Sequence, residues 1–186
     1  SSELGAKFAA ETAIEKFKPK KIAIMYANNP FGEASRRIYT EIIQKSNLLI
    51  SATETFMDGD KDFKTQLTKI KISNPDIILC STYWGEGAII LKQMEELNLN
   101  MPIIGEDGWH GEIASLVGKK GLKQLYFADI LFGNEVPDNP VMQNFITKYE
   151  SKFNKKATTS AATGYDAINI VKNVLQYTNY DSDSIK

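Results

Sequence analysis

Three short segments of the sequence hold the side chains best suited to chemistry or binding. Each follows an apolar run and contains an aromatic residue: ANNPFGE at 27–33, STYWGEG at 81–87 and GEDGWHGE at 105–112. The third segment also carries the adjacent carboxylates Glu106 and Asp107. Aromatic walls beside a carboxylate are typical of a cleft for a small molecule. The residues that we expect to line such a cleft are Phe31, Tyr83, Trp84, Asp107, Gly108 and Trp109.

A structural explanation of the same residues is open at this point. The aromatic side chains would then cover the edge of a sheet, and the carboxylate of Asp107 would cap the helix that follows it. Position in the sequence does not separate this explanation from a binding site.

The sequence predicts no catalytic, metal or cofactor site. His110 is the single histidine, and we interpret it as a polar surface residue rather than a base or a ligand. No zinc-peptidase, nucleophile-elbow, phosphate-loop or paired-cysteine motif occurs. GEG at 85–87 lacks the third glycine of a dinucleotide-binding loop, and Asp58, Asp60 and Asp62 lack the closing glutamate of a calcium loop. We therefore expect no enzyme activity.

The composition is that of an ordinary globular chain. Its 186 residues can bury a core. Of these residues 42% are hydrophobic, and 22 basic against 23 acidic residues give a formal net charge of −1. We expect no nucleic-acid partner, because the basic residues form no concentrated patch. No apolar run approaches the roughly 20 residues that span a bilayer. The single cysteine, Cys80, lies in the apolar run DIILCS and is predicted to be a buried hydrophobic residue.

Strand and helix patterns alternate along the chain. Short apolar runs are typical of strands buried in a parallel sheet, and apolar residues three or four positions apart are typical of helices. The sequence therefore predicts an α/β fold, with a Rossmann-like parallel sheet and helices on both faces. The three segments above then follow strand ends, where ligands of such sheets bind. We expect strands at 21–27, 48–56, 77–81, 103–105 and 125–131, and helices at 3–17, 33–46, 61–72, 86–97, 110–117, after Pro140, and at 160–177.

Two segments bear on domain organisation. FGNEVPDNP at 132–140 is rich in proline, asparagine and acid, and it predicts a boundary. The opening SSELGAK is polar and helix-like, with no feature of a signal peptide. We expect this start to be a cut inside a longer protein.

Four segments in a fixed order carry a family resemblance. They are KPKKIAIMYANNPFGE, MDGDKDFKTQLTKIKISNPDIILCSTYWGEGAIILKQMEEL, MPIIGEDG and GYDAINIV, and together they span most of the chain from 18 to 171. The sequence resembles the type I periplasmic binding proteins. The most similar branch is that of the leucine/isoleucine/valine-binding proteins, the solute receptors of branched-chain amino-acid ABC transporters.

In that family the ligand lies between two Rossmann-like lobes joined by three crossovers. The resemblance implies that residues 1–19 are the helix after the first crossover and that 20–131 are the second (C-terminal) lobe. Residues 132–186 would be a helical segment that returns toward the first lobe. Most of the first lobe would lie outside this sequence. We expect the apolar faces of helices within 141–177 to seek another surface, such as a second copy of the chain.

The resemblance also implies roles for three residues. Phe31 stands where family members commonly have a tyrosine that faces the cleft, although Phe31 lacks the phenol hydroxyl. Tyr83 matches an aromatic residue that covers the ligand, and Asp107 matches the acid that receives the α-ammonium group of the ligand. The groups that hold the ligand's carboxylate would belong to the first lobe, so this sequence does not identify the ligand.

The implied function is the capture of an amino acid or small amide by the binding component of an ABC transporter. Its partner would be a membrane permease, and its location the periplasm or the extracellular surface, with a lipid anchor as one form. An alternative is the extracellular sensory module of a signalling receptor with the same fold. A transmembrane segment and a signalling domain in the full-length gene would select that alternative. An α/β enzyme is the third class, and it would need a nucleophile and a base that this sequence does not offer.

Overall fold

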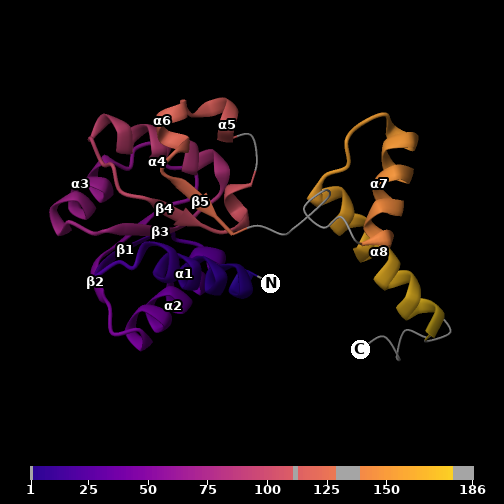
Figure 1. Cartoon of the computed structure of the whole chain (residues 1–186), viewed down its shortest axis with the longest axis horizontal. Helices are drawn as coiled ribbons and strands as arrows, with labels where there is room; N and C mark the ends of the chain where they lie inside the picture. Colours follow the sequence, from indigo (N-terminus) through magenta and orange to yellow (C-terminus); the bar gives the residue numbers. More distant parts are fainter. Residues whose placement is uncertain (1, 111–112, 129–138, 178–186) are drawn as a thin grey trace. The chain divides into compact units, whose positions relative to one another are not determined.

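A computed structural model of the chain describes residues 2–110, 113–128 and 139–177. The chain divides into two compact units, Ser1–Asp129 and Ile130–Lys186. The first unit contains a sheet with helices on both faces, and the second contains two helices (Figure 1). The predicted boundary segment 132–140 lies outside the described residues except for its last two positions.

A parallel sheet of five strands, in the order β2-β1-β3-β4-β5, forms the centre of the first unit. The expected α/β fold is therefore confirmed. The sequence predicted the positions of β1, β3 and β4 well because each is a short apolar run bounded by polar residues or turns, whereas the pattern of β2 is only partly alternating. The last strand is shorter than the expected 125–131, and residues 129–131 lie outside the described part. The strands are β1 Lys21–Ala27, β2 Leu49–Phe56, β3 Ile77–Ser81, β4 Ile103–Gly105 and β5 Leu125–Phe127.

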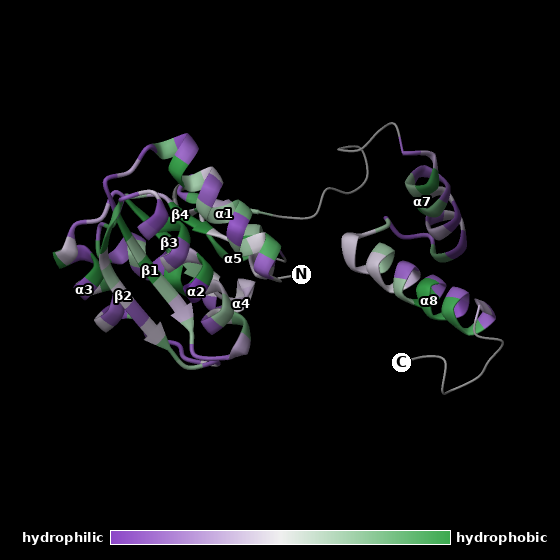
Figure 2. Ribbon diagram, turned by 90° about the horizontal axis from the view of Figure 1, so that it is seen from below, coloured by the Kyte–Doolittle hydropathy of each residue, from purple (hydrophilic) through white to green (hydrophobic). Residues whose placement is uncertain are grey.

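Helices cover both faces of the sheet and enclose two apolar clusters. On one face, α1 (Ser2–Phe17) and α2 (Pro30–Lys45) bury alanines, Tyr39 and Ile43 against β1, β3 and β4. On the other face, α3 (Lys64–Ser73), α4 (Trp84–Glu96) and α5 (Ile113–Leu116) cover the second cluster, which includes Cys80 as predicted. The short helix α6 (Lys119–Leu122) follows α5 and was not expected. Figure 2 shows the hydrophobic residues concentrated on the sheet between these helices.

Two helices begin two or three residues earlier than the sequence pattern predicted, and α3 begins three residues later, at Lys64 rather than at 61. Helix α2 begins at Pro30 rather than at 33, because Asn29 caps it: the Asn29 Oδ1 accepts a hydrogen bond from the Gly32 N–H at 2.8 Å. Proline is favoured at the first helical position, where no backbone donor is needed. Helix α4 begins at Trp84 rather than at 86. Phe31 and Trp84 therefore lie in first helical turns, and not in exposed loops.

The predicted start of the helix expected at 110–117 is wrong. A 3₁₀ turn, η1 (Asp107–Trp109), follows β4, and α5 begins only at Ile113. Residues 111–112 between them lie outside the described part. The indole of Trp109, the last residue of this turn, is fully buried.

Within residues 139–177, the described part of the second unit forms α7 (Pro140–Phe153) and α8 (Thr159–Tyr177), which confirms the two expected C-terminal helices. The ring of Phe145 on α7 contacts that of Tyr165 on α8 at a centroid distance of 5.0 Å. Helix α8 buries none of its residues. Among the described residues, no helix is both long and apolar enough to cross a membrane.

Candidate functional site

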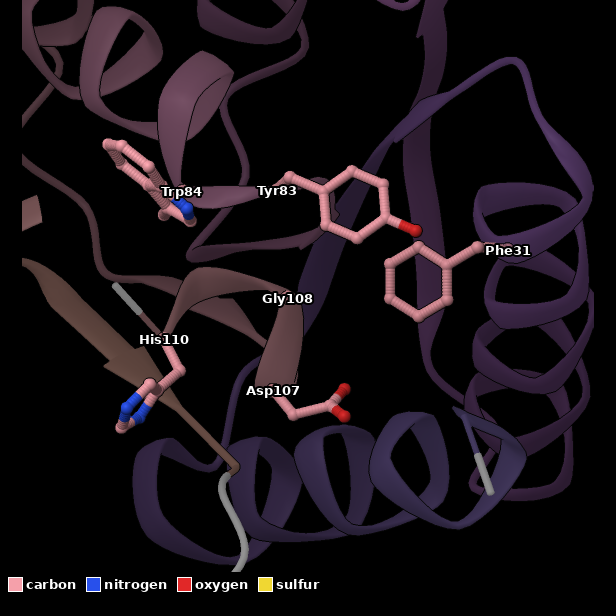
Figure 3. Close-up of a pocket in the computed structure, with 6 residues that line it drawn as sticks. All are labelled: Phe31, Tyr83, Trp84, Asp107, Gly108 and His110. Carbon is pink, nitrogen blue, oxygen red and sulfur yellow. The ribbon is translucent and has the colours of Figure 1, made fainter. Parts of the chain in front are cut away.

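The carboxyl ends of β1, β3 and β4 meet around one open cavity of about 430 Å³ (Figure 3). Each of the three segments that the sequence singled out contributes to its lining. Five of the six expected ligand-binding residues line this cavity, and His110 lines it as well. The lining residues are Phe31, Tyr83, Trp84, Asp107, Gly108 and His110.

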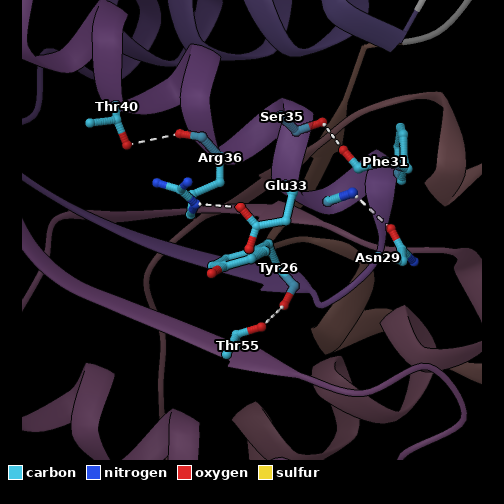
Figure 4. A network of polar contacts seen from close by, with 9 residues as sticks. Tyr26, Asn29, Phe31, Glu33, Ser35, Arg36, Thr40 and Thr55 are labelled. Atoms are coloured by element: carbon cyan, nitrogen blue, oxygen red, sulfur yellow. Dashed lines mark hydrogen bonds and ion pairs between the residues drawn. The ribbon is translucent and has the colours of Figure 1, made fainter.

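The first turn of α2 holds Phe31 in place. Asn29 caps the helix, and the Ser35 hydroxyl lies 3.1 Å from the Phe31 carbonyl oxygen, as a donor to it (Figure 4). The Phe31 ring stacks on the Tyr83 ring, with centroids 5.4 Å apart and an interplanar angle of 21°. Offset stacking of this kind is favourable for aromatic pairs. The two rings form a continuous aromatic wall that draws its residues from two different strand ends.

Gly108 is required by the close approach of its backbone to neighbouring chain segments. A Cβ atom at this position would lie 2.5 Å from the Thr82 carbonyl oxygen and 3.4 Å from the Phe31 ring. Any side chain would therefore push the turn η1 away from β3. The glycine brings the loop after β4 against the aromatic wall.

Asp107 is exposed beside this wall. Within the described part of the chain its carboxylate makes no hydrogen bond and no ion pair, whereas its backbone carbonyl accepts from the His110 N–H at 2.9 Å. No described residue therefore supports the alternative in which the Asp107 side chain caps a helix. The carboxylate is available to a cation from solvent.

Trp109 occupies a different place from the other expected site residues. Its side chain is fully buried and its indole N–H donates to the Cys80 carbonyl oxygen at 2.9 Å. Cβ atoms at Gly87 or Gly105 would lie within 3 Å of the indole, so both glycines make room for it. Trp109 supports the floor of the site from the core and is not among the residues that line the cavity.

His110 was expected to be a polar surface residue and was not expected in the site. The structure places it on the cavity wall, with an exposed side chain. Its position three residues after Asp107, within the same segment 105–112, was the signal available in the sequence.

Glu106 is a second acidic residue that the sequence analysis did not assign. Its side chain is fully buried, and both carboxyl oxygens contact α2: Oε1 accepts from the Tyr39 hydroxyl at 2.5 Å, and Oε2 lies 3.0 Å from the Ser35 hydroxyl oxygen. Burial raises the pKa of Glu106 to about 7, although the contacts with Tyr39 and Ser35 lower it. Burial and the neighbouring Glu106 likewise raise the pKa of Tyr39 well above its usual value.

A signal for this buried acid was present in α2. Ser35 and Tyr39 are four residues apart on the buried face of that helix. Two hydroxyl groups on a buried face require polar partners. An acidic residue next to a strand end would supply them, although acidic residues are rarely buried.

The donor set of the cavity does not resemble a metal centre. Within residues 2–110, 113–128 and 139–177, no group of three or more His, Cys, Asp or Glu side chains is arranged to hold an ion. The cavity combines aromatic rings with the Asp107 carboxylate, which pairs with no described residue, and this suits an organic ligand with an apolar part and a cationic group.

Comparison with known proteins identifies the family of the chain. The family model described as "Periplasmic binding protein" matches residues 3–185. The Leu/Ile/Val-binding protein BraC3 of Rhizobium johnstonii is 23% identical over 167 residues, which cover 90% of this chain and 44% of that protein.

Two solved structures show the same fold. The leucine-binding protein LivK of Thermotoga maritima superposes with a TM-score of 0.85 at 20% identity, over 99% of this chain and 53% of that one. The branched-chain amino acid transporter substrate-binding protein LivJ of Streptococcus pneumoniae, in complex with isoleucine, gives a TM-score of 0.75 at 27% identity. The match covers 94% of this chain and 50% of LivJ.

The chain thus spans about half the length of these proteins. The family model, in contrast, matches almost every residue. We conclude that the chain belongs to the periplasmic binding protein family, as its resemblance to the type I members of that family predicted.

Proposed function

We propose that this chain supplies one wall of the binding site of an ABC-transporter substrate-binding protein, and that the ligand is an amino acid, branched-chain or similar. In this proposal residues 20–131 are the second lobe, residues 1–19 are the helix that leads into it, and residues 132–186 return toward a first lobe. The protein acts outside the cytoplasm, in the periplasm or at the extracellular surface, and delivers its ligand to a membrane permease. The names of the relatives, and the isoleucine bound to LivJ, support this class of ligand.

One observation carries the proposal: an aromatic wall and a carboxylate without a partner among the described residues lie together at the carboxyl ends of three parallel strands. The rings of Phe31 and Tyr83 would contact the apolar side chain of the ligand. The carboxylate of Asp107 would accept charge-assisted hydrogen bonds from its ammonium group. Such bonds contribute on the order of 1.5–3 kcal/mol.

In this proposal, high ligand affinity requires the opposite wall of the site, which the first lobe would supply. The described cavity is open on one side, so an amino acid bound to it alone leaves its carboxylate in water. Two-lobed receptors close by a hinge motion around the ligand. Closure would remove water from Asp107, which is favourable only when a cation accompanies it.

Calorimetry with leucine, isoleucine and valine tests this function. A protein that contains both lobes should bind at least one of them at micromolar concentration. The 186-residue chain alone should show no binding below millimolar concentration. Micromolar binding by the 186-residue chain would contradict the two-wall site, and failure of all three ligands to bind the two-lobed protein would contradict the ligand class.

A further inference from the structure

The hydroxyl groups of Tyr39 and Ser35 supply two hydrogens to three acceptor oxygens. These acceptors are the two carboxyl oxygens of Glu106 and the carbonyl oxygen of Phe31. The Ser35 hydroxyl oxygen lies 3.1 Å from the Phe31 carbonyl and 3.0 Å from Glu106 Oε2. A serine hydroxyl carries one hydrogen, and a carbonyl only accepts. When Ser35 donates to Phe31, its contact with Glu106 therefore needs a hydrogen from the carboxyl group.

A neutral Glu106 satisfies every one of these contacts. Its Oε2–H donates to the Ser35 hydroxyl oxygen, Ser35 donates to the Phe31 carbonyl, and the Tyr39 hydroxyl donates to Oε1. When Glu106 is ionised, the Ser35 hydroxyl donates its hydrogen bond to the carboxylate instead, and the Phe31 carbonyl loses that donor. The protonation of Glu106 is thus linked to the helical turn that holds the aromatic wall.

The groups that face Glu106 come from four elements. Tyr39 on α2 donates to it, and Ser35 on α2 is in hydrogen-bond contact with it. On β3 lie the buried thiol of Cys80 and the hydroxyl of Ser81, which lowers the pKa of Glu106 but makes no hydrogen bond to a described residue at normal hydrogen-bond geometry. The carboxylate of the adjacent Asp107, in η1, disfavours the charged form of Glu106. Helix α1 approaches through Gly5, which has no side chain to titrate. Among the described residues, no cation is within reach of Glu106 to offset the repulsion from Asp107.

We propose that Glu106 is a positioning residue that keeps its proton while the site is empty and releases it to the solvent when a cationic group binds at Asp107. The cation cancels the repulsion between the two carboxylates, so the charged form of Glu106 becomes favourable. Ligand affinity then rises with pH across the neutral range, and ligand binding releases a proton. The proposal has two halves. The proton half, that Glu106 holds a proton whose release Asp107 controls, does not depend on the proposed function. The ligand half, that ligand binding releases this proton, rests on the proposed function.

The proton half is tested on the 186-residue chain without any ligand. Carboxyl ¹³C NMR follows each glutamate during a pH titration, and Glu106→Gln identifies the resonance of Glu106. We expect Glu106 to titrate near neutral pH. Asp107→Asn should shift its titration to lower pH, because the variant removes a neighbouring charge and keeps the shape. Tyr39→Phe should shift it to higher pH, because the variant removes a donor to the charged form.

Glu15→Gln on α1 is the matched control for Asp107→Asn. It also turns a carboxylate into an amide, but it lies ten residues, about 15 Å along the helix, from Gly5. It should leave the titration of Glu106 unchanged. The proposal is wrong if Glu106 titrates together with the exposed glutamates, or if Asp107→Asn does not move its titration.

The ligand half is tested with leucine on the two-lobed protein. Between about pH 5.5 and about pH 8.5, we expect affinity to rise by about fivefold, the lower end of the usual coupling between two sites. Glu106→Gln should remove this rise, because glutamine can donate to Ser35 and accept from Tyr39 as the neutral acid does. His110→Gln should retain it, which separates the effect of Glu106 from that of the imidazole that also lines the cavity.

The outcomes of the two experiments are distinguishable. An equal rise with pH in wild type and Glu106→Gln would overturn the link between Glu106 and the ligand. If leucine, isoleucine and valine bind at no pH, the proposed function fails, and the NMR titration of the ligand-free chain still decides whether Glu106 holds a proton that Asp107 controls.

Discussion

The aromatic wall is the part of the site where single residues have separable roles. Phe31 and Tyr83 stack on one another, and Tyr83 is about half exposed. Both rings therefore present apolar surface to the cavity without forming part of the core. A residue with that placement contributes contact area to a ligand and little to folding.

Phe31→Ala and Tyr83→Ala should each weaken binding in the two-lobed protein. Truncation of a ring that contacts the ligand typically costs about 1–3 kcal/mol, or roughly 5- to 150-fold in Kd. The melting temperature should change little for Tyr83→Ala, because its side chain is exposed. Calorimetry with leucine checks the first statement and a thermal scan the second. Unchanged affinity in both variants would show that the wall does not face the ligand.

Trp109 should behave in the opposite way, although the sequence suggested it as a ligand-binding residue. Trp109→Phe removes the indole N–H that donates to the Cys80 carbonyl and leaves space between Gly87 and Gly105. We expect the free energy of unfolding to fall by about 1–3 kcal/mol. Leucine affinity at a temperature where the variant is folded should change less than it does in Tyr83→Ala. A stable variant that loses affinity would return Trp109 to the binding site.

At the scale of elements, Glu106 fastens the end of β4 to α2. Because burial raises its pKa from 4.5 to about 7, the folded state binds more protons than the unfolded state between these two values. The free energy of unfolding therefore falls as pH rises from 4.5 to 7 and is constant with respect to this group above that range. A shift of this size corresponds to about 3 kcal/mol.

Urea titrations of the 186-residue chain at several pH values would detect this fall. Glu106→Gln should be free of the part of the pH dependence that Glu106 contributes, because the amide does not titrate. The wild type and the variant should therefore differ in slope between pH 4.5 and 7 and run parallel above it. Identical slopes across the whole range would show that Glu106 is ionised in the folded chain throughout.

The sequence predicted the elements better than it predicted their ends. Buried strands such as Ile77–Ser81 are continuous apolar runs, so their limits are visible in the sequence. The start of α2 was missed by one turn because the decisive feature is local: an asparagine side chain and a proline set the first helical residue, ahead of the apolar periodicity. The parallel direction of the strands followed from the spacing of the helices between them, whereas the strand order β2-β1-β3-β4-β5 was not predicted.

The site was predictable as a region rather than as a set of contacts. Strand ends meet at one edge of a parallel sheet, which located five of the six lining residues. The burial of Trp109 and Glu106 depends on long-range packing, against β3 in one case and α2 in the other. A sequence pattern within one segment carries no information about such partners.

At the scale of the whole molecule, the second unit exposes an unusual amount of apolar surface. Several large apolar side chains of α7 and α8 are more than half exposed, and surfaces of this kind usually contact another protein surface. Those exposed side chains are Val141, Phe153, Ile168, Ile170, Val171 and Tyr177. In the proposed function this surface returns to the first lobe.

The 186-residue chain should therefore self-associate in solution. Sedimentation at increasing concentration is expected to show a dimer, and Ile168→Glu should shift the equilibrium toward monomer. Asn173→Asp also adds one negative charge to an exposed position of α8 but removes no apolar surface, so it should leave the dimer in place. A wild-type chain that stays monomeric at all concentrations would contradict this use of the surface.

The central claim is that Asp107 accepts the ammonium group of an amino acid, and the affinity of Asp107→Asn for leucine tests it most directly. The measurement is calorimetry on the two-lobed protein, with Glu15→Gln as a carboxylate-to-amide control outside the cavity and melting temperatures as a check on folding. We predict a loss of about tenfold or more in Asp107→Asn, from charge-assisted bonds of roughly 1.5–3 kcal/mol, with an unchanged melting temperature. Unchanged affinity would contradict the claim, and a lower melting temperature beside it would show that Asp107 has a structural role instead.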